Sequence, residues 1–367
     1  MKVLFDHQIY NNQNYGGISR YFYELSKGLK KQNVDVENTI AFSDNGFTQD
    51  KDIFNARKLP AIKFKGKSFL KKHFNQYTSE KIIKKGNFDI FHPTYYGTYF
   101  VDRQKLKKPF VVTFYDLIHE KFAEKYPEDL TNVEQELTER RLLLQKASKI
   151  ISISHSTKQD IIDYYQVDPA KIEVTHLASS MSIEGVRENE KLGKYVLYVG
   201  NRSAYKNFKT FVRAIAPLLV NDPELKIVSA GGGAFVSEEQ AFFQSLHISN
   251  QVTQIGINDK ILADLYFNAQ CFIFPSLYEG FGIPALEAFS CNCPTILSNV
   301  SSLPEVGGDA ALYVNPESEN DILTQVEKFV NNPNLRNEYK IKGLKQAEKF
   351  SWDTMASKTL EIYQSIL

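Results

Sequence analysis

Hydrophobic and polar positions alternate along this chain on two length scales. Short runs of β-branched and aromatic residues are separated by longer stretches with helical spacing, for example Ser19–Lys31 and Asn132–Ala147. The short runs, five in each half, are Lys2–Phe5, Phe88–His92, Phe110–Phe114, Lys149–Ile153 and Ile172–His176, then Tyr195–Gly200, Leu225–Ala230, Val252–Ile255, Cys271–Pro275 and Pro294–Ser298. This rhythm predicts an α/β protein built from βαβ units around parallel sheets.

The alternation of strand-like and helical stretches is interrupted once, which indicates two domains. The segment Ser180–Lys194 is polar and lacks periodicity, so we interpret it as a linker. A chain of 367 residues also exceeds what one hydrophobic core usually holds. We therefore predict Rossmann-like domains over 1–182 and 183–351, followed by an amphipathic helix over 352–367 whose partner the pattern does not fix.

Composition limits the binding partners and the cellular compartment that we expect for the protein. A formal net charge of +1 gives no overall attraction to nucleic acid. Cys271, Cys291 and Cys293 form no CxxC pair or disulfide framework and fit a reducing compartment. The N-terminus turns polar again after three apolar residues, and no run approaches the roughly 18 apolar residues of a membrane span. We expect a cytoplasmic protein.

One stretch departs from this balance of charge. Residues 57–85 contain ten Lys or Arg and a single acid, Glu80, with Phe64, Phe69, Leu70 and Phe74 among them. Basic residues interleaved with apolar ones can bind the anionic inner face of a membrane peripherally. A solvated face on an insertion explains the same pattern, and both interpretations stay open.

The segment from Phe274 to Ala288 carries the most chemistry. A buried strand ends at Pro275, the chain turns through Gly280 and Gly282, and a helix is predicted to start at Pro284. Because ligands bind at the carboxyl ends of parallel strands, a phosphate can meet backbone N–H groups here. Glu279 and Glu287 flank this turn, and their carboxylates suit the recognition of sugar hydroxyls.

Two further loops supply the cations and glycines that an anionic ligand needs. Arg202 and Lys206 follow the first strand of the second half, at the same predicted sheet edge, and can neutralise a pyrophosphate leaving group. In the first half Gly16 and Gly17 lie between a strand and a helix, where they suit anion contact.

These motifs resemble family 4 of the retaining GT-B glycosyltransferases. The resemblance is carried by the Glu-x7-Glu run from Glu279 to Glu287, by the segment 303–311 and by the Gly16-Gly17 loop. It implies a GT-B fold with two Rossmann-like domains facing across a cleft, and a helix 352–367 that returns to the first domain. The residue roles that it implies are Glu279 on the donor sugar, Glu287 on the ribose, Arg202 and Lys206 on the diphosphate, Gly17 close to it, and the backbone of Phe281, Gly282 and Ile283 beside the donor.

One segment of the first half departs from the family pattern. Tyr115 stands where the family often has histidine, within Val112–Leu117. Asp116 is retained, and His119 can substitute for the missing imidazole from one turn further on. A structural interpretation of Asp116 and His119, as a cap on the next helix, is equally open. His92, His155 and His176 also follow strands and are interpreted as structural.

Together these features predict a retaining hexosyltransferase that needs no cofactor and no metal ion. The expected donor is a nucleoside-diphosphate sugar, GDP-mannose or a UDP-hexose, and the expected acceptor is a saccharide or lipid-linked hydroxyl in surface polysaccharide synthesis. Nucleotide-sugar epimerases share the architecture and remain an alternative, as does a non-catalytic sugar-nucleotide-binding protein. Gly231-Gly232-Gly233 is not GxGxxG, which disfavours dinucleotide oxidoreduction.

Overall fold

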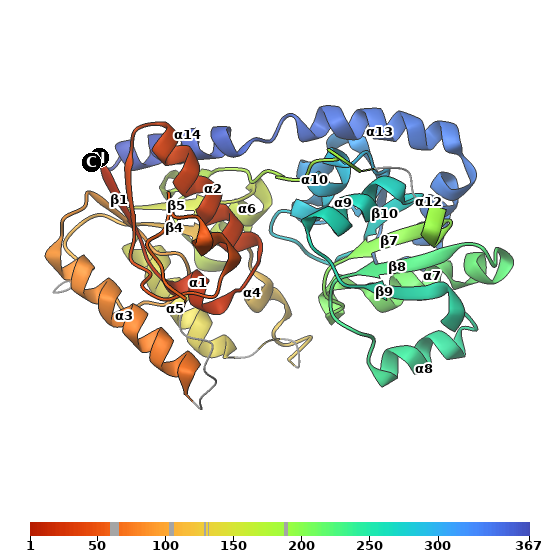
Figure 1. The fold of residues 1–367 in the computed structure, drawn as a ribbon, viewed down its shortest axis with the longest axis horizontal. Coiled ribbons are helices and arrows are strands. Elements are labelled where there is room, and N and C mark those ends of the chain that lie inside the picture. The colour runs from red at the N-terminus through yellow and green to blue at the C-terminus, as the bar shows by residue number, and fades with distance from the viewer. Residues whose placement is uncertain (59–65, 103–105, 128–129, 131, 187–189) are drawn as a thin grey trace. The chain divides into compact units, whose positions relative to one another are not determined.

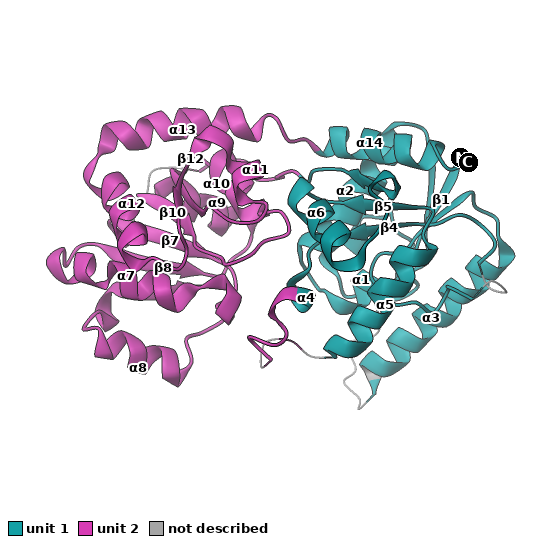
Figure 2. Cartoon of the chain, turned by 180° about the vertical axis from the view of Figure 1, so that it is seen from behind, with its two compact units in different colours: residues 1–120, 131–177, 352–367 teal, residues 121–130, 178–351 magenta. Residues whose placement is uncertain are grey.

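The computed structural model describes residues 1–58, 66–102, 106–127, 130, 132–186 and 190–367 (Figure 1). The chain forms two compact units, which Figure 2 distinguishes by colour. Unit 1 comprises residues 1–120, 131–177 and 352–367, and unit 2 comprises residues 121–130 and 178–351. The sequence did not indicate that residues 121–130 leave the first half of the chain for unit 2.

Unit 1 contains parallel strands in the orders β2-β1-β3 and β4-β5-β6. A parallel bridge between Phe91 and Phe110 lies at the start of β4. The strands are β1 (Lys2–Phe5), β2 (Asp35–Asn38), β3 (Ile90–His92), β4 (Val111–Phe114), β5 (Lys149–Ser152) and β6 (Ile172–Val174). The hydrophobic runs predicted all of these except β2, whose sequence Asp-Val-Glu-Asn carries a single apolar residue because β2 lies at a sheet edge.

Helices cover the strands of unit 1, and the chain passes into unit 2 within α4. The helices are α1 (Gln8–Asn12), α2 (Gly17–Lys31), α3 (Lys67–Lys85), α4 (Ile118–Phe122), α5 (Val133–Lys146), α6 (His155–Tyr165) and the C-terminal α14 (Trp352–Gln364). Helix α14 packs on α2 so closely that a Cβ at Gly28 would lie 2.3 Å from the Cβ of Ala356. The Tyr363 hydroxyl also lies 2.6 Å from His92 Nδ1, which ties α14 to β3.

Unit 2 contains one six-stranded parallel sheet in the order β12-β11-β10-β7-β8-β9. Its strands are β7 (Tyr195–Val199), β8 (Lys226–Ala230), β9 (Val252–Ile255), β10 (Cys271–Phe274), β11 (Thr295–Ser298) and β12 (Ala311–Val314). The chain builds outward from β7 in one direction and then from β10 in the other. The loops after β7 and β10 therefore leave the sheet side by side, at the switch point where doubly wound folds bind ligands.

The core of unit 2 follows from the alternation of side chains along these buried strands. One face packs Val196, Tyr198, Ile227 and Ile273 against Phe211 and its neighbours. The helices are α7 (Phe208–Asn221), α8 (Ser237–Ser245), α9 (Asp259–Asn268), α10 (Ile283–Ser290), α11 (Leu303–Gly307), α12 (Glu319–Asn331) and α13 (Pro333–Ala347). The three cysteines are buried and unpaired. Among the described residues, no helix combines the length and apolar character needed to cross a membrane.

Candidate functional site

The loops after β7 and β10 meet in an ion pair. Lys206, in the turn η4 (Ala204–Lys206), places its Nζ 2.6 Å from Oε1 of Glu279. The Leu277 N–H donates to the Tyr205 carbonyl across 2.8 Å, which joins the two loops through their backbones. The side chains of Lys206 and Glu279 are only 16% and 10% exposed, so the pair is largely shielded from water. The structure thus brings together two residues that lie 73 positions apart in the sequence.

Two aromatic rings surround the ammonium group of Lys206. Its Nζ lies 5.2 Å from the ring centre of Tyr205 and 5.3 Å from that of Phe274. The negative faces of such rings attract a cation. Lys206 is therefore held at the sheet edge by one full charge and two rings, where it can also meet an anionic ligand.

Asn207 fixes the loop that carries Lys206. It adopts the left-handed conformation at φ 61°, and its Nδ2 donates to the carbonyls of Pro275 (3.0 Å) and Pro316 (2.7 Å). The loop after β7 is thereby tied to the ends of β10 and β12. Sequence reasoning did not single out Asn207, although asparagine is one of the few residues that tolerates this backbone region at a helix start.

The turn before α10 requires Gly282. Its φ of 107° is strained for any other residue, and a Cβ there would lie 2.7 Å from Cδ2 of Leu303. Helix α10 begins at Ile283, with Pro284 as its second residue, one position earlier than predicted. The helix N-terminus therefore directly follows the glycine turn, as an anion site requires.

Two serines hold the backbone of this turn. Ser301 Oγ accepts a hydrogen bond from the Glu279 N–H at 2.9 Å. Ser302 Oγ lies 2.8 Å from the Glu279 carbonyl and 2.9 Å from the Phe281 carbonyl. The Phe281 side chain is buried, with its ring centre 5.9 Å from that of Phe350. These contacts fix the backbone from Glu279 to Phe281, and with it the Glu279 carboxylate.

Glu287 lies in the second turn of α10 and is half-buried. Its Oε2 accepts a hydrogen bond from the Tyr266 hydroxyl at 3.3 Å. Burial, with the Glu287 charge adding to it, raises the pKa of Tyr266 well above its ordinary value. Tyr266 therefore stays protonated and keeps the carboxylate of Glu287 oriented.

Arg202 forms an ion pair with Glu239 of α8. Its Nε and Nη2 donate to the two oxygens of Glu239 at 2.5 and 3.2 Å, and its fork also reaches the carbonyls of Gly231, Gly233 and Ala234. The Arg202 side chain is 7% exposed. Arg202 therefore holds the turn after β8 and the start of α8. Glu239 was not predicted, since it belongs to a helix start 37 residues away.

Tyr198 connects the two ion pairs electrostatically. Burial is the main cause of a pKa raised well above the usual value; the charge of Glu279 adds to it, while that of Arg202 opposes it. The protonated hydroxyl donates to the Asn201 carbonyl at 2.6 Å. Glu279 and Arg202 thus act on the pKa of Tyr198 in opposite directions.

The side chain of Gln13 covers the predicted Gly16-Gly17 loop of unit 1. Gly16 is extended, with φ 170° and ψ 165°, and α2 starts at Gly17. The Oε1 atom of Gln13 accepts from the Ser19 N–H at 3.2 Å and lies over Gly16, 2.3 Å from where a Cβ would be. Gln13 therefore satisfies one of the donors at the N-terminus of α2.

Asp116 and His119 meet around a third residue, Arg140. Asp116 Oδ1 accepts from the Ile118 N–H at 3.1 Å and so caps α4, while its carbonyl accepts from Arg140 Nη1 at 3.0 Å. His119 Nδ1 lies 3.3 Å from Arg140 Nη2. The structural interpretation of Asp116, as a helix cap, therefore describes its observed contacts.

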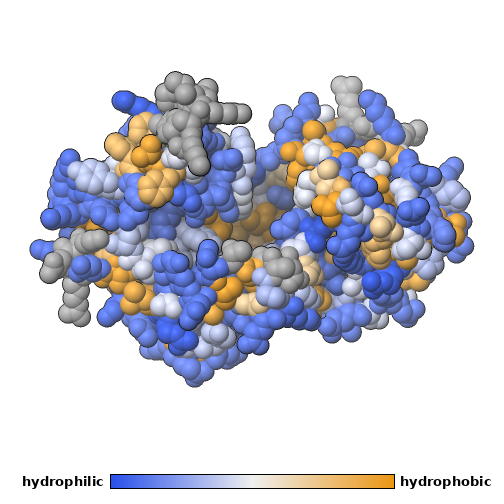
Figure 3. Space-filling model, turned by 90° about the horizontal axis from the view of Figure 1, so that it is seen from below, coloured by the Kyte–Doolittle hydropathy of each residue, from blue (hydrophilic) through white to orange (hydrophobic). Residues whose placement is uncertain are grey.

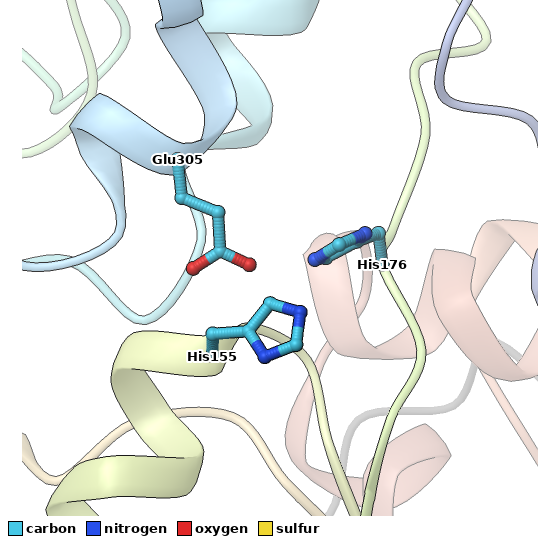
Figure 4. A group of neighbouring side chains, drawn as sticks. All are labelled: His155, His176 and Glu305. Carbon is cyan, nitrogen blue, oxygen red and sulfur yellow. The ribbon is translucent and has the colours of Figure 1, made fainter.

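Three further histidines, His92, His155 and His176, lie at or just after strand ends of unit 1. Figure 4 draws His155 and His176, whose ring centres are 5.6 Å apart. His92 is buried between Tyr363 and Thr113, at 2.6 and 2.9 Å. Burial lowers the pKa of His92 to about 3, so it is neutral in the folded protein at physiological pH.

Comparison with known proteins gives the family. Residues 15–178 match the profile of Glycosyltransferase Family 4, and residues 183–346 match Glycosyl transferases group 1. The chain is 30% identical over 285 residues to the O-antigen chain mannosyltransferase B of Escherichia coli, covering 74% of each chain. It is 26% identical over 234 residues to the MMP alpha-(1->4)-mannosyltransferase of Mycolicibacterium hassiacum, covering 62% of this chain and 56% of that one.

Solved structures show the same fold. The sucrose-phosphate synthase of Thermosynechococcus elongatus superposes with a TM-score of 0.79 at 18% identity, over 99% of this chain and 98% of that chain. HepE of Anabaena, in complex with UDP and glucose, superposes with a TM-score of 0.76 at 16% identity over 100% of both chains. These likenesses establish the GT-B fold, and the sequence matches establish the family: the chain belongs to the group 1, family 4 glycosyltransferases.

Proposed function

We propose that this glycosyltransferase transfers a hexosyl group to a hydroxyl of a saccharide or lipid-linked acceptor during surface polysaccharide synthesis. Mannose is the sugar that we favour. The donor is a nucleoside-diphosphate sugar, and the anomeric configuration is retained. The Escherichia coli relative is named as an O-antigen chain mannosyltransferase and the Mycolicibacterium relative as a mannosyltransferase, which supports mannose. HepE binds UDP and glucose, which supports a nucleotide-linked donor and keeps a UDP-hexose as the alternative to GDP-mannose.

The Lys206–Glu279 ion pair is the observation that carries this proposal. A carboxylate that binds sugar hydroxyls repels the diphosphate of the same donor unless a cation lies between them. Lys206 Nζ, at 2.6 Å from Glu279, is such a cation. When the anomeric C–O bond breaks, negative charge grows on the departing diphosphate, and a fixed cation lowers the energy of that state. We assign Lys206 to the diphosphate and Glu279 to the donor sugar.

The other candidate residues complete the assignment. Glu287 is proposed to bind the ribose hydroxyls, and the backbone of Gly280, Phe281, Gly282 and Ile283 to flank the donor at the start of α10. Arg202 is proposed to add positive charge next to the diphosphate. In unit 1 we propose Gly16 and Gly17 as anion contacts and Asp116 and His119 as contacts of the sugar or acceptor.

We expect the reaction to proceed without a divalent metal ion or a bound cofactor. Lys206 and Arg202 supply the positive charge that a metal would otherwise bring to the leaving group. Transfer measured in excess EDTA should therefore match transfer in added Mg²⁺. A loss of activity in EDTA that Mg²⁺ restores would contradict this part of the proposal.

We further propose a cytoplasmic protein that contacts the anionic inner membrane surface through α3. Phe69, Leu70 and Tyr77 on this helix are 61%, 56% and 64% exposed, among exposed lysines 72, 81, 84 and 85. On the face drawn in Figure 3, hydrophobic residues form separate patches within a mostly hydrophilic surface. Residues 59–65 of the basic stretch lie outside the described residues. Exposed aromatic and aliphatic groups beside lysines suit an anionic bilayer.

Vesicle sedimentation tests the membrane contact. The wild-type protein should sediment with phosphatidylglycerol-containing vesicles and not with neutral phosphatidylcholine vesicles. The double substitution Phe69→Ser and Leu70→Ser should abolish sedimentation. Ile341→Ser, at an equally exposed residue of α13 (58%), is the matched control. Equal sedimentation of the double variant and the wild type would refute the α3 surface.

A donor screen tests the transfer reaction itself. Thermal shifts with GDP and UDP identify the base, because a ligand stabilises the folded state according to its affinity. The matching sugar nucleotides are then incubated with saccharide and polyprenyl-linked acceptors, and NMR of the product gives the anomeric configuration. An inverted product would refute retention. Conversion of the donor to an epimer without acceptor would refute transfer.

A further inference from the structure

Arg140 of α5 is a fully buried cation in unit 1, with 1% of its surface exposed. Its Nη1 donates to the Asp116 carbonyl at 3.0 Å and to both oxygens of Glu120 at 3.1 and 3.0 Å. The Glu120 side chain is itself 0% exposed. One edge of the guanidinium therefore holds the segment that follows β4, from Asp116 to Glu120.

The other edge of the guanidinium is anchored to its own helix. Nε and Nη2 donate to Glu136 Oε1 at 3.1 and 2.7 Å. The Cζ atom lies 4.3 Å from the ring centre of Tyr96. Burial opposes the charge of Arg140, yet the acidic groups around it, led by Tyr96 and Glu120, raise its pKa well above the usual value. The guanidinium is thus a charged, planar clamp between α5 and the loop after β4.

The same clamp fixes the imidazole of His119. Arginine has donors and no acceptor, so its contact with His119 Nδ1 at 3.3 Å requires Nδ1 to accept. The proton of a neutral ring then lies on Nε2, which is 3.4 Å from Glu136 Oε2. Arg140 and Glu136 together select one tautomer and one orientation of the ring.

We propose that Arg140 is a positioning residue for glycosyl transfer, which holds Asp116 and His119 in the geometry that the reaction needs. This inference rests on the proposed function, in which Asp116 and His119 contact the sugar or acceptor. Arg140 acts through these two residues. Its fork reaches Asp116, Glu120, Glu136 and His119 at once, and a lysine ammonium on a flexible stem cannot reproduce that set.

Kinetics of Arg140→Lys, with Arg141→Lys as matched control, test the role in catalysis. Arg141 is the next residue of α5 and is exposed. Below its unfolding temperature, Arg140→Lys should lose about 10²-fold in kcat, because a small misplacement of reacting groups has an effect of this order. The Kd of the nucleoside diphosphate should stay within about twofold, since one weakened positioning contact leaves ground-state binding in place. Arg141→Lys should match the wild type.

A wild-type kcat for folded Arg140→Lys would overturn the inference. If Arg140→Lys does not fold, Glu120→Gln replaces it, because the amide keeps the shape and weakens the Arg140 contact. This variant should lower kcat in the same direction without changing nucleotide affinity, and an unchanged kcat would again overturn the inference.

The tautomer of His119 provides a readout that does not depend on activity. In ¹⁵N-histidine-labelled wild-type protein, with His119 assigned from the spectrum of His119→Asn, Nε2 should carry the proton and Nδ1 should not. A proton on Nδ1 would overturn the clamp. If no donor is turned over by the wild type, the proposed function fails, whereas the tautomer still tests the geometry around Arg140.

Discussion

The two units carry their candidate residues at the same kind of place, just beyond the carboxyl ends of parallel strands, but they pair charges differently. In unit 2, Lys206 forms an ion pair with Glu279, and Arg202 forms one with Glu239. In unit 1 a single cation, Arg140, faces Asp116, Glu120 and Glu136. Lys206 is proposed to meet the diphosphate, whereas Arg140, which faces three carboxylates, ties the loop after β4 to α5.

A second polar network shows that unit 1 uses buried charge for structure. Asp6, directly after β1, is 0% exposed and accepts hydrogen bonds from the Thr94 N–H and hydroxyl at 2.8 and 2.6 Å and from the Tyr99 hydroxyl at 2.9 Å. Such a saturated carboxylate has little capacity left for a ligand. In the proposed function, the cations that face the diphosphate are Lys206 and Arg202 of unit 2, while Arg140 of unit 1 fixes the loop after β4.

The largest effect is expected when either member of the Lys206–Glu279 ion pair is removed. Lys206→Ala and Glu279→Ala should each reduce transfer about 10²- to 10³-fold, the usual loss when one group that stabilises developing charge is removed. Lys209→Ala is the control, because Lys209 makes a similar pair with Glu238 but is 55% exposed on α7. Initial rates and circular dichroism at one temperature are the measurements. Near-normal turnover in both variants would refute the assignment.

Gly282→Ala tests whether the turn between the ion pair and α10 must keep its backbone shape. An alanine is strained at φ 107° and would press on Leu303, so unfolding free energy should fall by about 1–3 kcal/mol. Gly256→Ala is the control, since Gly256 lies outside the left-handed region with open space where its Cβ would be. Denaturant unfolding of both variants gives the difference. Equal stabilities would show that the turn relaxes freely.

The pH dependence of the unfolding free energy tests whether His92 is a buried, neutral residue of unit 1. Its folded pKa of about 3 lies below the ordinary value of 6.5, so the unfolded chain binds the extra proton as pH falls below 6.5. The folding free energy contributed by keeping His92 neutral is fully present above pH 6.5. It is lost as the pH falls from 6.5 to 3, at about 1.4 kcal/mol per pH unit. His92→Asn should reduce the slope of unfolding free energy against pH by that amount there, and leave it parallel to wild type above pH 7. Parallel profiles throughout would contradict a neutral, buried His92.

The smallest expected effect sharpens the role of Arg202. Glu239→Gln leaves one oxygen as an acceptor and removes the counter-charge of Arg202, so the affinity for a nucleoside diphosphate should rise about fivefold, equivalent to about 1 kcal/mol of Coulomb energy near a surface. Glu238→Gln, its exposed neighbour, is the control. Isothermal titration calorimetry measures both. A weaker affinity for Glu239→Gln would show that Arg202 serves only the turn after β8.

Periodicity predicted most of the fold because buried parallel strands are continuous apolar runs. It missed β2 and β12, where Asp-Val-Glu-Asn and Ala-Leu-Tyr-Val lie at sheet edges and offer short or polar runs. Sheet-edge reasoning also predicted that the loops of Lys206 and Glu279 share one edge. The roles of Glu239, Asn207 and Arg140 were not predicted, because their partners lie on other elements and no local spacing in the sequence encodes such contacts.

Nucleotide affinity measured by calorimetry tests the central assignment most directly. GDP and UDP are titrated into wild type, Lys206→Ala and Lys209→Ala. For whichever nucleotide binds the wild type, Kd should rise at least about tenfold in Lys206→Ala, or about 1.4 kcal/mol, and stay unchanged in Lys209→Ala. An unchanged Kd in folded Lys206→Ala would contradict the placement of the diphosphate beside the loops after β7 and β10.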